Sequence, residues 1–222
     1  MMAKVNTDSA HVYWNAEWQR SDATSPWARP EAEVMSHAAR LRPGARVLDL
    51  GAGIGRHALA LARLGHQVTA LDASEASIDI IATASLREGL PLDSRLGRMT
   101  TLPFPDASFD HVLSWNVIYH GDETIVRRTF AEVARVLRPG GTFMATMLSA
   151  RRLPVEQAKA TGQEVSPGTW VFEGEGDKIH PHYFCNACRL TELLEGFELW
   201  RLEDHEHEKP GSWHWHFLAE RL

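Results

Sequence analysis

A glycine-rich loop between a short apolar run and an amphipathic segment constrains this chain most strongly. Residues 47–57 read Val-Leu-Asp-Leu-Gly-Ala-Gly-Ile-Gly-Arg-His. Glycine permits tight backbone turns and lets a ligand approach where a Cβ would clash. Asp72 ends the next apolar run, about 20 residues later, where a carboxylate can accept hydrogen bonds from both hydroxyls of a ribose. Together, the loop and Asp72 predict a site for a nucleoside-like ligand in an α/β fold.

Short apolar runs alternate with helix-length segments through the middle of the chain. The pattern predicts strands at 46–50, 67–71, 111–114 and 142–148, and helices at 54–64, from residue 74, and at 124–137. Repeated β-α units of this kind predict a parallel sheet with helices on both faces. The right-handed crossover rule makes a doubly wound topology the expected arrangement.

The chain has the size of one α/β domain at 222 residues, and its two ends differ from the alternating centre. We divide this single domain into an aromatic-rich N-terminal flap, a core, an irregular insertion rich in Gly, Pro and charge, and a C-terminal helix with a hairpin. These parts span residues 1–40, 41–149, 150–182 and 183–222. In the last part we expect a helix at 188–194 and strands at 197–203 and 213–220.

Composition excludes several classes of protein. The 29 acidic and 23 basic residues give a formal net charge of −6, which argues against a nucleic-acid partner. No apolar run approaches the ~20 residues needed to span a bilayer, and residues 1–10 lack the apolar region of a secretory signal. Two cysteines make no disulfide framework. We therefore expect a cytoplasmic protein without a membrane partner.

Two residues distinguish the loop from a dinucleotide-binding fingerprint. That fingerprint is G-x-G-x-x-G, whereas the spacing here is G-x-G-x-G and the sixth position is Arg56. Asp49, two residues before the first glycine, would repel a pyrophosphate but can face an ammonium group. The loop therefore favours a nucleoside that carries an amino acid over the dinucleotide of an oxidoreductase.

Four motifs in order resemble those of the class I S-adenosylmethionine-dependent methyltransferases. They are the loop at 47–57, Leu-Asp-Ala-Ser at 71–74, Leu-Pro-Phe-Pro-Asp-Ala-Ser-Phe-Asp at 102–110 and Val-Leu-Arg-Pro-Gly-Gly at 136–141. Residues 13–27 are more loosely similar to the N-terminal flap of the thiopurine and tellurite-resistance methyltransferases. The resemblance implies a Rossmann-like seven-stranded sheet whose last strand is antiparallel. It also implies S-adenosyl-L-methionine as the cofactor and a small-molecule methyl acceptor.

The resemblance implies roles for individual residues as well. The residues that would contact the cofactor are Asp49, Gly51, Ala52, Gly53, Gly55, Asp72, Ala73, Met99, Leu102, Trp115 and Asn116. After the third strand the family commonly has Gly-Asp, but this chain has Gly97-Arg98. This departure leaves open the alternative of a non-catalytic sensor or scaffold that binds S-adenosylmethionine or a nucleotide with the same fold.

Candidates for the chemistry follow the fourth strand. His120 titrates near neutrality and is the candidate base if the acceptor must lose a proton, with Tyr119 beside it. The alternative is that His120 only caps the next helix or packs beneath the loop. Trp14 and Trp27 are candidate walls of the acceptor pocket, because the family flap lies there, while Trp18 is assigned to the core.

Four histidines near the C-terminus form a further candidate group. A turn at 209–212 predicts the pairs Glu208–Trp213, His207–His214, Glu206–Trp215 and His205–His216. Side chains alternate along a strand, so all four histidines would share one face at the carboxyl edge of the sheet. His207 and His214 are therefore candidate acceptor residues, and the alternative is a purely structural ladder.

A second cluster has the residue types of a metal site, namely His180, His182, Cys185 and Cys188. Structural zinc sites usually draw their ligand pairs from separated segments, whereas these four residues lie within nine positions. A helix starting near residue 186 accounts for the cysteines as small, partly buried residues. We therefore expect no metal.

Overall fold

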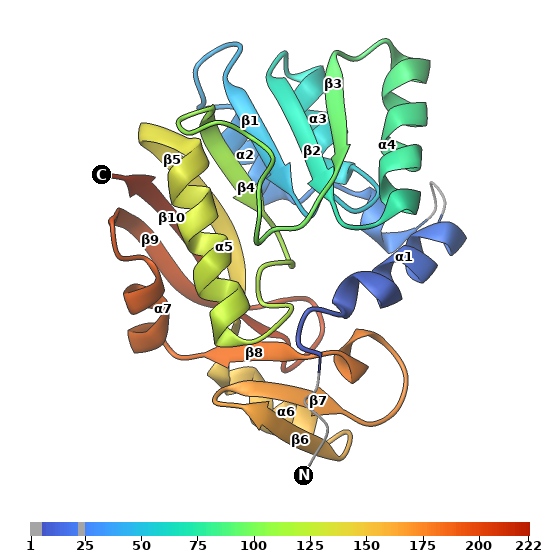
Figure 1. The fold of residues 1–222 in the computed structure, drawn as a ribbon, viewed down its shortest axis with the longest axis vertical. Helices are drawn as coiled ribbons and strands as arrows, with labels where there is room; N and C mark the ends of the chain where they lie inside the picture. Colours follow the sequence, from blue (N-terminus) through green and yellow to red (C-terminus); the bar gives the residue numbers. More distant parts are fainter. Residues whose placement is uncertain (1–5, 22–24) are drawn as a thin grey trace.

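A mostly parallel sheet forms the centre of the computed structural model, which describes residues 6–21 and 25–222 (Figure 1). Five parallel strands lie in the order β3 (Leu92–Leu96), β2 (Gln67–Asp72), β1 (Arg46–Leu50), β4 (Phe109–Ser114) and β5 (Leu137–Ser149). Next to β5 lies β10 (Trp213–Arg221), which is antiparallel to it, and β9 (Phe197–Glu206) follows. These seven strands are the sheet that the resemblance implies, including its antiparallel last strand.

Helices cover both faces of this sheet, as predicted. Two apolar clusters lie on either side of it. One holds side chains of α2 (Ala32–Ala38), α3 (Arg56–Arg63) and α4 (Glu75–Glu88), and the other holds side chains of α5 (Glu123–Val136) and α7 (Ala187–Leu193). Ser74 and Asp122 cap α4 and α5, because the side-chain oxygen of each accepts a backbone N–H of its helix's first turn. The helices therefore begin within a residue or two of their predicted starts.

The segment 150–182 is not irregular, which corrects the prediction. It contains η2 (Ala150–Arg152), α6 (Leu153–Gln157), the hairpin β6 (Gly162–Ser166) and β7 (Thr169–Phe172), and η3 (Asp177–Ile179). β7 pairs with β8 (His182–Cys185), and β8 pairs in parallel with the end of β5 through Leu148 and Phe184. These pairings extend the sheet to ten strands (Figure 1). The strands are only four or five residues long, so their apolar pattern is weak in the sequence.

The N-terminal flap is largely helical. Its elements are α1 (Ala10–Arg20), η1 (Pro26–Ala28) and α2. Helix α1 lies across the end of the sheet near β1 and β2 and contacts α4 (Figure 1). Part of the prediction about a secretory signal concerns residues 1–5, which lie outside the described residues. No helix in the described part of the chain is long and apolar enough to cross a membrane.

The C-terminal hairpin has its turn where the sequence predicts it but a different register. Ser212 N–H donates to Lys209 O across the turn at 3.0 Å. Trp213 pairs with Glu206 rather than Glu208, and His214 pairs with His205 rather than His207. This slip of two residues adds His207 and Glu208 to the loop. Because side chains alternate with a period of two, the slip leaves the four histidines on the same face.

Candidate functional site

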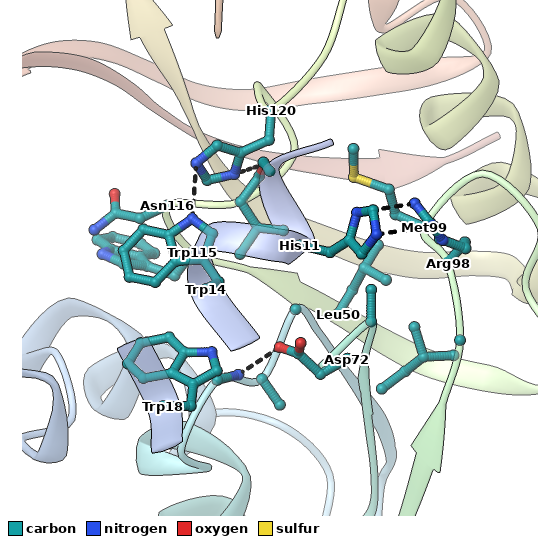
Figure 2. Close-up of a pocket in the computed structure, with 18 of the residues that line it drawn as sticks. His11, Trp14, Trp18, Leu50, Asp72, Arg98, Met99, Trp115, Asn116 and His120 are labelled. Carbon is teal, nitrogen blue, oxygen red and sulfur yellow. Dashed lines mark hydrogen bonds between the residues drawn. The ribbon is translucent and has the colours of Figure 1, made fainter. Parts of the chain in front are cut away.

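A cavity lies at the carboxyl ends of β1, β2 and β4 and is covered by α1 (Figure 2). The empty space enclosed by its lining, counted out to open solvent, is about 980 Å³. Eleven of the residues singled out in the sequence line it, namely Trp14, Trp27, Gly51, Ala52, Gly53, Asp72, Ala73, Met99, Trp115, Asn116 and His120. The cavity is at the edge of the sheet where ligands of open α/β folds bind.

Other predicted site residues lie outside the lining. They are Asp49, Gly55, Leu102, Tyr119, His207 and His214. Leu102 and Tyr119 belong to the main apolar core, and burial raises the pKa of the Tyr119 hydroxyl well above its usual range. Tyr119 is therefore not exposed to the cavity as a proton donor or acceptor.

The glycine loop has the close backbone approach that the sequence predicts. Gly51 and Gly53 both have positive φ, at 76° and 55°, so side chains are disfavoured there. A Cβ on Gly51 would overlap Val117, and a Cβ on Gly53 would lie 3.0 Å from the Trp18 ring. The loop is also tied to β2, because Gly53 N–H donates to Asp72 Oδ2 at 2.8 Å (Figure 2).

Asp49 lies beneath this loop with a carboxylate oxygen that lacks a partner. Its Oδ2 is buried and makes no hydrogen bond to any residue that the structure describes. Burial raises the pKa of Asp49 to about 7, although the charge of Arg56 opposes the shift. A cationic group bound above the loop would supply the missing positive charge.

Asn116 and Trp115 form the wall at the end of β4. Asn116 has a φ of 62°, a conformation that asparagine tolerates better than most residues. Its N–H donates to Thr146 Oγ1 at 2.8 Å, and its Oδ1 accepts the Thr146 hydroxyl at 3.2 Å. The indole N–H of Trp115 is buried and has no acceptor within the described ranges. These contacts fix the chain as it leaves the strand and passes the cavity.

Helix α1 places three side chains on the cavity from one face. His11, Trp14 and Trp18 are spaced by three and four residues, which is helical spacing, and all three line the cavity. The Trp14 and Trp18 rings stack at 5.0 Å, and Trp27 meets Trp14 edge-on at 5.5 Å. The assignment of Trp18 to the core alone is thus incomplete, because it is buried and lines the cavity too. Its spacing from Trp14 is the signal in the sequence that identifies it.

Arg98, at the position where the family commonly has aspartate, holds the N-terminal segment against the cavity. Its guanidinium donates to Asp8 Oδ1 at 2.8 Å and to the His11 ring at 3.1 Å. Arg98 and His11 both line the cavity (Figure 2). The departure from the family pattern therefore has a structural role in this chain, which is to attach the helical cover to the segment after β3.

Comparison with known proteins agrees with this geometry. Residues 47–141 match the family model described as "Methyltransferase domain". A probable S-adenosylmethionine-dependent methyltransferase of Mycolicibacterium smegmatis is 33% identical over 78% of this chain, which spans 60% of that protein. A ubiquinone biosynthesis O-methyltransferase of Xanthomonas axonopodis pv. citri is 39% identical over 73% of this chain and 71% of its own length. The chain belongs to the family of S-adenosylmethionine-dependent methyltransferases.

A solved structure shows the same fold along the whole of this methyltransferase chain. The 1,6-didemethyltoxoflavin-N1-methyltransferase of Burkholderia thailandensis, determined with its substrate and S-adenosylhomocysteine, superposes with a TM-score of 0.70. The match covers 100% of this chain and 92% of that one at 20% identity, so it establishes the fold alone. The cofactor of the family is S-adenosylmethionine.

His120 is the imidazole that the sequence predicted at the cavity. Its Nδ1–H donates to Val117 O at 2.7 Å, which leaves Nε2 with a lone pair when the ring is neutral. Trp14 Nε1–H points at this Nε2 from 3.4 Å (Figure 2). On the other side, Nε2 lies 3.7 Å from Asp177 Oδ2. The ring is thus held by its backbone bond with a basic nitrogen beside the cavity.

The four hairpin histidines gather behind the cavity wall. His207 stacks on His214 at 3.9 Å and His205 lies 4.8 Å from His216, so they share one face as predicted. His216 in turn packs 4.7 Å from the Trp115 ring. Burial and the neighbouring imidazoles lower the pKa of His214 to about 2 and of His207 to about 3. His216 thus packs behind the wall at Trp115, and none of these four histidines lines the cavity.

The cluster His180, His182, Cys185 and Cys188 does not converge. Cys185 is buried and its thiol points to Leu148 O, whereas Cys188 is exposed and lies near Glu192. His182 instead faces Asp177 and His120, which lie on other segments. Asp177 carries no motif in the sequence, and only the fold brings it to this place.

Proposed function

We propose that this chain transfers a methyl group from S-adenosylmethionine to a small-molecule acceptor in the cavity under α1. The observation that carries the proposal is that the two ends of the cavity differ in chemistry. Carboxylates lie below and beside the glycine loop, and aromatic rings with His120 line the opposite end. The names of the ubiquinone-biosynthesis and toxoflavin relatives favour a small molecule as acceptor. A cytoplasmic location and the lack of a nucleic-acid partner stay predictions from the sequence.

The cofactor would lie along the loop and the end of β2. The ammonium of its methionine part would be neutralised by Asp49, whose buried Oδ2 lacks a partner among the described residues. Its ribose hydroxyls would donate to Asp72, whose oxygens already accept the N–H groups of Gly53 and Ser74 and keep further lone pairs. Met99 and Ala73 would enclose the adenine.

The acceptor would lie between the sulfonium and α1. The sulfonium supplies an electrophilic methyl group, so the protein has to align the acceptor and exclude water. Trp14 and Trp27 form an apolar wall, and Trp115 and Asn116 close the end near β4. His120 lines this space, and its Nε2, beside the Trp14 indole N–H, is the nitrogen that would take a proton from an acceptor that carries one.

Two measurements test the proposal against the sensor alternative. Calorimetry with S-adenosylhomocysteine and NAD reports which nucleoside the cavity takes. Incubation with methyl-labelled S-adenosylmethionine and a panel of phenols, carboxylic acids, amines and thiols reports transfer. Binding of NAD alone contradicts the proposal. Tight binding of S-adenosylhomocysteine without transfer to any member of the panel favours a sensor.

Cofactor affinity should depend on the ionisation of Asp49. Below pH 7 the free protein holds this carboxyl protonated, because burial raises its pKa to about 7. The ammonium of the ligand needs the charged form. We expect the association constant for S-adenosylhomocysteine to rise about tenfold per pH unit up to pH 7 and then to level off. Calorimetry from pH 5.5 to about pH 8 measures this profile.

The control for this profile is a matched pair of variants. Asp49→Asn should bind weakly and without the rise, whereas Asp79→Asn, at an exposed position on α4, should keep it. If the association constant of Asp49→Asn still rises with pH, the pH dependence belongs to another group.

Replacing His120 with asparagine should separate catalysis from cofactor binding. The asparagine amide can take the place of Nδ1–H against Val117 O, so the loop stays anchored while Nε2 is lost. We expect turnover to fall by about 100-fold or more, the usual contribution of a positioned base, with affinity for S-adenosylhomocysteine within about threefold. Equal losses of both would indicate a damaged loop, and unchanged turnover would remove His120 from the reaction.

A further inference from the structure

Three side chains from separate segments converge at the edge of the cavity. His120 follows β4, Asp177 begins η3 and His182 begins β8. Each offers one ligand atom, and these three atoms all lie within 4.8 Å of one another. His182 is completely buried and His120 nearly so, while the Asp177 side chain is 26% exposed. The fold thus gathers two imidazoles and a carboxylate from positions 57 and five residues apart in the chain.

Both imidazoles are held in the same tautomer. His120 Nδ1–H donates to Val117 O at 2.7 Å, and His182 Nδ1–H donates to His180 O at 2.8 Å. A carbonyl oxygen only accepts, so each Nδ1 carries the proton and each Nε2 has a lone pair in the neutral ring. Histidines that bind metals typically use their second nitrogen in this way, which fixes the orientation of the ring.

The two Nε2 atoms face one carboxylate oxygen. Asp177 Oδ2 lies 3.2 Å from Nε2 of His182 and 3.7 Å from Nε2 of His120, while Lys178 Nζ lies 3.6 Å from the other oxygen, Oδ1. The Trp14 indole N–H points at the His120 Nε2 from 3.4 Å, so the closer contact is the one between the His182 Nε2 and the Asp177 carboxylate. A nitrogen lone pair and an anionic oxygen at this distance repel each other unless a positive charge lies between them. A proton on His182 relieves this contact alone, whereas a cation bound to all three atoms would also take the His120 lone pair from the long Trp14 hydrogen bond.

We propose that His120, Asp177 and His182 bind a divalent transition-metal ion. Two imidazole nitrogens and one carboxylate oxygen suit Zn²⁺ or Fe²⁺, whereas Mg²⁺ is bound mainly through oxygen ligands and water. Three protein ligands leave a coordination position open, as in catalytic zinc sites. Of the three residues only His120 lines the cavity, so we place the open position on its side, where the acceptor would lie.

The role of this ion rests on the proposed function. An acceptor with a hydroxyl or carboxylate oxygen would be its further ligand, and the cation lowers the pKa of a bound hydroxyl. The hydroxyl proton leaves to water. The oxygen then forms its bond to the methyl carbon while the carbon–sulfur bond breaks and its electron pair stays on sulfur. In this scheme His120 acts as a metal ligand. The ion, rather than His120 as a base, promotes the loss of the acceptor's proton.

Titration with zinc alone tests the site. We expect protein stripped with a chelator to bind one Zn²⁺ per chain by calorimetry, and Co²⁺ to give visible absorption bands in its place. Asp177→Asn and His182→Gln should each weaken zinc binding at least about 100-fold, since losing even an outer-shell partner costs 10–100-fold. His180→Gln and Cys188→Ser are the matched controls and should bind as the parent does. The isosteric Asp177→Asn serves where the buried His182→Gln fails to fold.

Two results would overturn the metal proposal. One is a parent protein that binds no zinc, and the other is zinc binding that survives both ligand variants. A titration with S-adenosylhomocysteine on the same stripped protein separates this failure from that of the proposed function. If S-adenosylhomocysteine binds but zinc does not, only the metal proposal is wrong. If zinc binds but S-adenosylhomocysteine does not, the proposed function is wrong and the metal proposal stands.

Discussion

Replacing Asp72 with alanine is expected to raise the dissociation constant for S-adenosylhomocysteine at least about 100-fold. Two hydrogen bonds to a charged carboxylate contribute roughly 1.5–3 kcal/mol each, and 1.4 kcal/mol is a factor of ten. The variant also removes the acceptor for Gly53 N–H, which holds the glycine loop in place. Both losses act on the same cofactor site. Isothermal calorimetry measures the change.

The matched control is Asp93→Ala, on the neighbouring strand β3, where the carboxylate is exposed and paired with Arg95. It should leave cofactor affinity unchanged. Melting temperatures of both variants show whether the folded state survives. A dissociation constant for Asp72→Ala within about threefold of the parent would show that this acid does not hold the ribose.

Removing the buried Asp110 carboxylate should cause a large loss of folding stability. Its oxygens accept from Arg42 at 2.6 Å, from Arg46 N–H at 2.7 Å and from Arg138 at 2.6 Å. The side chain is 5% exposed and joins the beginnings of β1, β4 and β5. Asp110→Ala is expected to lower the free energy of unfolding by about 3 kcal/mol, the low end for a broken buried pair, because the arginines are partly exposed.

Urea unfolding measures this loss, with Asp106→Ala as the control. Asp106 is 78% exposed and paired with Arg135, so its removal should cost at most about 1 kcal/mol. Equal losses in the two variants would contradict the role of Asp110. Cofactor affinity should change little in both, because Asp110 lies at the amino edge of the sheet, opposite the cavity.

The same carboxylate predicts a pH dependence of stability. Burial alone would raise the pKa of Asp110, but the N–H of Arg46 and the guanidinium groups of Arg138 and Arg42 outweigh it and lower the pKa to about 2. A lowered pKa in the folded state stabilises the protein above the unfolded value of 3.8. This stabilisation should be lost as the pH falls from about 4 to 2, and that part of the acid slope should be absent in Asp110→Ala.

The sequence by itself determined the parts of this protein whose signals are local. The glycine loop, Asp72, the caps at Ser74 and Asp122 and the apolar strands each depend on residues within about ten positions. The alternation of side chains also predicted that the four hairpin histidines share a face, and this survived a slip of two residues in the register. Local spacing carries this information because helix and strand periods fix the direction of each side chain.

Only the tertiary structure decided what surrounds the acceptor. The short strands β6 to β8 have little apolar pattern, and β8 takes its place by pairing with the end of β5, 36 residues away along the chain from Leu148 to Phe184. That pairing brings His182 and Asp177 to His120, while Arg98 and the α1 rings close the opposite side. No local period links such residues. They meet because sheet pairing and burial of aromatic surface select one arrangement of segments far apart in the chain.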